Sequence, residues 1–319
     1  MTGWYNMKRY RIVLCGGLAT LLGSAMTLQA ESPALAAVAA PAKAVARTVQ
    51  CAAATAAQAP LARQMATEVN QRLQGRLSEV GLTLTDSQTG ITCWFHSAYH
   101  FYAASVVKVT ILSALLRKTM EEHRYLTSTE SADARLMITQ SNNDAATALW
   151  NDVGLRFMQH FLNLAGMKHT ELNVAWGLTR ITAYDEMLLL GLLSKPNKVL
   201  DDSSRAYALN LMASVISSQR WGVPAGAPKS VTVHVKNGWL PYPGSDWEIN
   251  SLGIFTTKHR TYMIAMLTYG NPSMAYGINT IEGAAEVIHA LLNPGKMARV
   301  PQSTPNPSWG IPDETVSGR

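Results

Sequence analysis

Three short motifs along the chain bring together the side chains that serine acyl transfer requires. In chain order they are Ser105-Val106-Val107-Lys108, Ser141-Asn142-Asn143 and Lys236-Asn237-Gly238, and each is the single match to its pattern (S-x-x-K, S-x-N, K-x-G) in the sequence. Acyl transfer needs a hydroxyl nucleophile, a base for its proton, and donors for the oxyanion. The three motifs together supply candidates for all of these.

Ser105 and Lys108 begin an apolar helix-like segment. Residues three apart on a helix share a face, so the Lys108 amine can lie beside the Ser105 hydroxyl. The free N–H groups of a helix start also suit a developing oxyanion. About one S-x-x-K is expected by chance in a chain of this composition, so the motif indicates a catalytic serine only in combination with the other two motifs.

Ser141-Asn142-Asn143 falls between two predicted helices. The Ser141 hydroxyl could pass a proton to a leaving group, and the Asn143 amide could hold a substrate amide. Taken alone, these residues are better explained by ordinary helix capping, and the two roles are compatible.

Lys236-Asn237-Gly238 ends an alternating segment typical of a strand. The Lys236 cation could bind a substrate carboxylate, Asn237 could hydrogen-bond, and Gly238 would let substrate lie close to the backbone. The next residue, Trp239, could line the site and offer a second oxyanion N–H. The alternative is an exposed edge strand with a solvated lysine and a turn.

Hydrophobic periodicity predicts the elements that must position these residues. A helix is expected from Pro60 with an apolar stripe that reaches Leu77, ending by Gly81. Further helices are expected from Ser105 and at about 132–140, 144–152, 155–165, 181–194, 202–218 and 280–292, and strands at 82–85, 91–95, 231–236, 247–255 and 261–269. The expected fold is α/β (α+β): one antiparallel sheet flanked by terminal helices, with an all-helical lobe (about 101–224) inserted.

The chain ends have a different character. Residues 1–36 resemble a secretory signal, with a basic start and a broken apolar run too short for a membrane span. Residues 37–58 are Ala-rich and are expected to be a linker, 59–293 form the catalytic domain, and 294–319 are expected to be a disordered tail. The mature protein should therefore be secreted, without a stable membrane span.

Cleavage would leave two cysteines, Cys51 and Cys93. Export permits a disulfide between them, and two free thiols are the alternative. Neither has metal-ligand spacing, so no metal and no other cofactor is expected.

The 319 residues carry a formal net charge of +6, part of which lies in the leader. No basic stripe with interleaved aromatic residues is present, so nucleic acid is not an expected partner. We expect a monomer that acts on a small molecule or peptide.

Taken together, the ordered motifs resemble the serine β-lactamase and D-Ala-D-Ala peptidase superfamily, class A β-lactamases most closely, over about residues 60–292. The resemblance implies that Ser105 is the nucleophile, Lys108 its base and Ser141 the proton shuttle. It also implies that Asn143 and Lys236 bind a β-lactam or cell-wall peptide.

The pattern departs from class A enzymes at three places. The spacing from Ser105 to Ser141 is short, and K-N-G replaces the usual K-[TS]-G. In addition, the family's E-x-x-L-N loop, whose glutamate activates the deacylating water, corresponds to His169-Thr170-Glu171-Leu172-Asn173, with His169 at the glutamate position. Either Glu171 or His169 could be the base, or both could be surface residues.

Three functions therefore remain open at this stage. The first is an exported β-lactamase-type hydrolase acting through a Ser105 acyl-enzyme. The second is a peptidase, penicillin-binding protein or esterase with the same serine. The third is a non-catalytic module that binds wall fragments or antibiotic.

Overall fold

The structure, a computed structural model, describes residues 48–241 and 246–298. The predicted signal segment and most of the predicted tail lie outside the described residues. No described helix is both long and apolar enough to cross a membrane.

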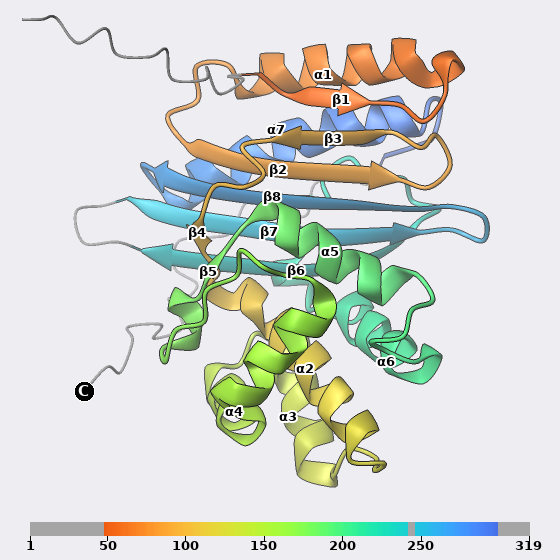
Figure 1. Cartoon of the computed structure of the whole chain (residues 1–319). Coiled ribbons are helices and arrows are strands. Elements are labelled where there is room, and N and C mark those ends of the chain that lie inside the picture. The colour runs from red at the N-terminus through yellow and green to blue at the C-terminus, as the bar shows by residue number, and fades with distance from the viewer. Residues whose placement is uncertain (1–47, 242–245, 299–319) are drawn as a thin grey trace, which may run out of the picture. The chain divides into compact units, whose positions relative to one another are not determined.

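A six-stranded sheet forms the centre of the described chain, with the strand order β1-β3-β2-β8-β7-β6 (Figure 1). Every neighbouring pair is antiparallel, as predicted. The strands are β1 (Gln50–Ala52), β2 (Glu79–Asp86), β3 (Thr92–Phe95), β6 (Thr232–Pro241), β7 (Trp247–Thr256) and β8 (Thr261–Asn271). A separate pair, β4 (Phe101–Tyr102) and β5 (Arg180–Ile181), lies beside the start of the helical lobe.

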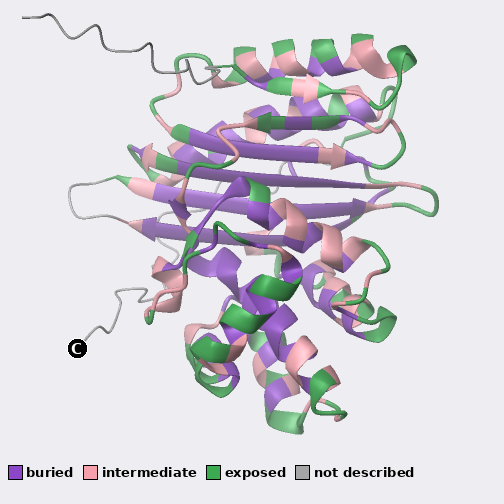
Figure 2. Ribbon diagram, viewed as in Figure 1, coloured by how far each residue is buried: buried purple, intermediate pink, exposed green. Residues whose placement is uncertain are grey.

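Helices cover both faces of the sheet. The terminal helices α1 (Ala59–Leu73) and α7 (Met274–Leu292) pack together on one face, and α5 (Ala183–Ser194) lies on the other. The lobe contains α2 (Val107–Glu121), α3 (Ser128–Thr139), α4 (Asn143–Ala165) and α6 (Asp202–Ala213). Helix α2 runs through its centre and is buried along most of its length (Figure 2).

Two predicted boundaries were wrong. Helix α1 ends at Leu73 because Gly75 turns the chain with φ 75°, so Leu77 lies outside the helix and is exposed, and Gly81 lies within β2. The break expected between helices at 144–152 and 155–165 is confirmed, because α4 consists of two helical segments separated by a kink at Gly154, where φ is 73° and ψ is 148°. The helix predicted to reach residue 218 ends at Ala213.

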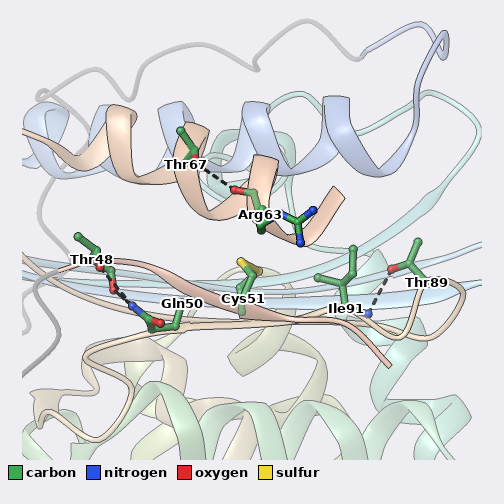
Figure 3. Close-up of a disulfide and its surroundings, with 8 residues drawn as sticks. Thr48, Gln50, Cys51, Arg63, Thr67, Thr89 and Ile91 are labelled. Carbon is green, nitrogen blue, oxygen red and sulfur yellow. Dashed lines mark hydrogen bonds between the residues drawn. A yellow bond between two sulfur atoms is a disulfide. The ribbon is translucent and has the colours of Figure 1, made fainter. Parts of the chain in front are cut away.

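The predicted linker is also partly wrong, because residues 50–58 contain β1 and a short 3-10 helix (Ala56–Gln58). A Cys51–Cys93 disulfide joins β1 to β3 at directly paired positions. Figure 3 shows Cys51 on the side of the sheet that faces α1. The disulfide thus fixes the first strand to the sheet.

Replacing both cysteines with serine is expected to lower the free energy of unfolding by about 2–4 kcal/mol, since the bond closes a long loop in the unfolded chain. Denaturant unfolding with and without reductant measures this. Reductant should destabilise the parent protein and leave the double-serine variant unchanged; an equal response of both would contradict a disulfide role.

Helix α5 buries a carboxylate, Glu186, that has no solvent exposure and no hydrogen-bond partner for either oxygen among the described residues. Burial, with a contribution from the charge of Asp185, raises the pKa of Glu186 from 4.5 to about 8. The folded protein therefore keeps this proton at neutral pH, whereas the unfolded chain loses it.

The Glu186 contribution to stability is fully present below about pH 4.5 and is lost as pH rises towards 8, because the folded state binds more protons across that range. Glu186→Gln should remove this loss, so the variant should match the parent at pH 4.5 and be more stable at pH 8. Thermal melts at both pH values test this. A constant stability difference between the two proteins across the range would contradict it.

Candidate functional site

Two segments distant in sequence hold the turn that carries Ser105. It forms a 3-10 turn (Ala104–Val106) that leads into α2, and Ala104 has a positive φ of 46°. The Ala103 N–H donates to the Thr179 carbonyl at 2.8 Å, and the Asn250 amide of β7 donates to the Tyr102 and Ala103 carbonyls at 2.8 and 3.2 Å. A positive φ in a residue other than glycine is costly and persists only where its surroundings enforce it.

Lys108 lies beside Ser105, as the spacing predicts. Four oxygens lie within hydrogen-bond distance of its Nζ: Ser105 Oγ at 2.8 Å, the Ser141 carbonyl at 2.8 Å, Ser141 Oγ at 3.1 Å and Asn143 Oδ1 at 2.6 Å. Ser105 and Lys108 are both fully buried. These four acceptors are neutral oxygens, which fix the amine next to the hydroxyl.

Ser141 connects the two motif lysines. Lys236 Nζ donates to Ser141 Oγ at 3.0 Å, so both ammonium groups share one hydroxyl. Ser141 has a positive φ of 58°, and Asn142 caps α4 by accepting the Ala145 N–H at 2.8 Å. Helix capping by Asn142 and the position of Ser141 beside Lys108 are therefore compatible.

Strand β6 passes directly beside the Ser105 turn at Gly238. A Cβ added at Gly238 would lie 2.8 Å from the Ser105 backbone nitrogen and 2.9 Å from that of Val106. This contact explains why glycine follows the Lys-Asn pair. Trp239, the next residue, is almost buried, and its ring centroid lies 5.9 Å from that of Trp221.

The exposed edge strand of the alternative interpretation is not found at β6. Although β6 is an edge strand, every residue from Val233 to Leu240 is buried, because the lobe covers it. Lys236 is fully buried and is not the solvated lysine of the alternative interpretation.

Asn237 was predicted to bind substrate, but its side-chain amide is hydrogen-bonded to other residues of the protein. Its Nδ2 donates to the carbonyls of Gln219 and Trp221 at 3.0 and 2.9 Å, and its Oδ1 accepts from Ser251 Oγ at 2.6 Å. Side chains alternate along a strand, so Asn237 points away from the face that Lys236 and Gly238 share. Asn237 therefore links β6 to the segment that contains Gln219 and Trp221.

His169 and Glu171 lie at the base of a loop and are bonded to other groups. His169 Nδ1 lies 3.1 Å from the buried carboxylate of Asp185, and its backbone N–H donates to the same carboxylate at 2.8 Å. Glu171 exchanges two backbone hydrogen bonds with Arg180, and its exposed carboxylate pairs with the Arg180 guanidinium at 2.7 Å. His100 Nε2 lies 3.5 Å from the same carboxylate.

Sequence reasoning missed two residues that shape this site. Trp176, in the 3-10 turn Trp176–Leu178, places its ring 4.7 Å from Lys108 Nζ, and Asn250 supports the Ser105 turn. Neither belongs to a recognisable motif; only the fold brings them to Ser105.

The model of the beta-lactamase enzyme family matches residues 128–292, about half of the chain. The chain belongs to the beta-lactamase enzyme family. The matched region includes Ser141 and Lys236, whereas Ser105 and Lys108 precede it and are joined to it by the hydrogen bonds above.

Solved structures show the same β-lactamase fold at low identity. TLA-1 extended-spectrum β-lactamase is 16% identical (TM-score 0.65), covering 72% of this chain and 98% of that one. A class A β-lactamase from Bacteroides cellulosilyticus is also 16% identical (TM-score 0.64), with the same coverage. The protein named PBP-A is 19% identical (TM-score 0.62), covering 72% and 96%.

A PBP-A variant was solved as an acyl-enzyme complex with penicillin G. No curated protein matches this sequence. Family and fold together make the chain a divergent β-lactamase-like protein.

Proposed function

We propose that this protein is an exported serine hydrolase that opens β-lactam rings through an acyl-enzyme on Ser105. The observation that carries the proposal is the 2.8 Å contact between Lys108 Nζ and Ser105 Oγ in a fully buried site. A serine hydroxyl becomes a good nucleophile when an adjacent base takes its proton.

The first step is proton transfer from Ser105 Oγ to the neutral Lys108 amine as Oγ attacks the lactam carbonyl carbon. The oxyanion forms beside the Ser105 and Trp239 backbone N–H groups, where Gly238 permits close approach.

The second step breaks the lactam C–N bond. Ser141 Oγ gives its proton to the departing nitrogen and recovers one from Lys108, which holds the proton taken from Ser105. Lys236 binds the substrate carboxylate, and Asn143 holds its amide while also fixing Lys108. The product is an acyl-enzyme with the ring opened.

A penicillin-binding protein or peptidase is the second candidate, because His169 and Glu171, the two candidate water-activating bases, are engaged at the base of the loop. The fold similarity to PBP-A agrees with it. A purely binding module would have no use for a serine bonded to a buried lysine amine.

Export is part of the same proposal. The signal-like N-terminus supports it, and the Cys51–Cys93 disulfide agrees with an oxidising compartment.

Ser141→Gly is expected to slow acylation by about 10²-fold or more, since it removes the proton donor for the departing nitrogen. Glycine is chosen because it accepts the positive φ at this position, which alanine does not. Stopped-flow acylation by a chromogenic cephalosporin measures the rate. An unchanged rate of adduct formation would contradict the shuttle, and unchanged binding without any adduct would favour a non-catalytic module.

A further inference from the structure

The loop between His169 and Thr182 packs against the turn that carries Ser105. The two hydrogen bonds between Glu171 and Arg180 close its base, and residues 172–179 form the tip. The turn Trp176–Leu178 packs on the turn Ala104–Val106 that carries Ser105. The tip is therefore the part of the loop that can influence chemistry at Ser105.

Residues 172–179 contain no ionisable side chain: they read Leu-Asn-Val-Ala-Trp-Gly-Leu-Thr. Asn173, the one amide, accepts the Ala175 N–H at 2.9 Å within the loop. A water molecule that attacks an acyl-enzyme needs a group to take its proton. The tip offers no such group.

Trp176 instead covers Lys108. Its ring centroid lies 4.7 Å from Lys108 Nζ, and its Nε1 donates to Thr147 Oγ1 of α4 at 3.1 Å. The indole is thus fixed between the loop and the helical lobe. An ordered water needs two to four polar partners, and the face of an indole ring supplies none.

We propose that Trp176 sets the lifetime of the acyl-enzyme: its ring keeps water from the ester on Ser105, so the acylated protein persists. The inference rests on the proposed function, because it concerns the fate of the same acyl-enzyme. His169 and Glu171 lie at the base of the loop, whereas the tip residues Trp176–Leu178 pack on the Ser105 turn.

The test is the decay of the penicillin G adduct, followed by intact mass after free penicillin is removed. Four proteins are compared: the parent, Trp176→Phe, Trp176→Ala and Val174→Ala. Val174 is an exposed residue of the same loop and controls for loop stability. Acylation rate and melting temperature are measured for each, because a merely structural role would change both and leave the decay rate unaltered.

The expected result is a slow decay shared by the parent, Trp176→Phe and Val174→Ala, and a decay about 10-fold faster or more in Trp176→Ala, which removes the covering ring. Equal decay in Trp176→Ala and the parent would overturn the inference, as would rapid hydrolysis by the parent itself. Absence of an adduct in every protein would instead overturn the proposed function.

Discussion

Replacing Lys108 with methionine is expected to slow acylation of Ser105 by about 10²–10⁴-fold, the range typical for loss of a general base. Methionine keeps a long apolar stem but has no amine to accept the Ser105 proton. Ser141 and Asn143 also lose a donor, so the variant should be less stable. Single-turnover kinetics with a chromogenic cephalosporin measure the acylation rate.

Lys118→Met is the matched control, because Lys118 lies on the same helix and pairs with Glu122 at the surface. It should acylate at the parent rate. A Lys108→Met protein that keeps its melting temperature and acylates as fast as this control would exclude Lys108 as the base.

Gly238→Ala is expected to reduce acylation by about 10²-fold, for a steric reason. The added Cβ would lie within 3.0 Å of the Ser105 and Val106 nitrogens and at 3.0 Å from the Ala103 carbonyl oxygen. All three are backbone atoms, so either β6 or the nucleophile turn must move. A displacement of about 1 Å can cost roughly 10²-fold in rate.

Gly191→Ala in α5 is the control, since its Cβ would meet nothing within 4 Å. It should leave acylation unchanged and raise the melting temperature slightly, because alanine favours helix. Normal acylation by Gly238→Ala would mean that the close contact between β6 and Ser105 is unimportant for the reaction.

The sheet and most of the helices could be predicted from the sequence because their apolar residues keep a clear period. The alternation that ends at Lys236 predicted β6, and the motif spacing brought Ser105, Lys108 and Ser141 into hydrogen-bond contact. Helix ends were less predictable. The stop at Leu73 depends on a positive φ at Gly75, which apolar periodicity does not reveal.

The loop over the site could not be predicted from the sequence, for a physical reason. Aligning residues by the Leu172-Asn173 pair suggested His169 or Glu171 as a base, but backbone pairing with Arg180 sets where the loop closes. That closure leaves Trp176 as the side chain above Lys108. Such contacts depend on elements far apart in the chain and carry no local signature.

The most direct test of the central claim is intact mass of the purified mature protein after exposure to penicillin G, with Ser105→Ala alongside. The account predicts a mass increase of one penicillin molecule, located on Ser105 by peptide mapping and absent from the variant. An adduct that survives in Ser105→Ala, or neither adduct nor ring opening with the parent protein, would contradict it.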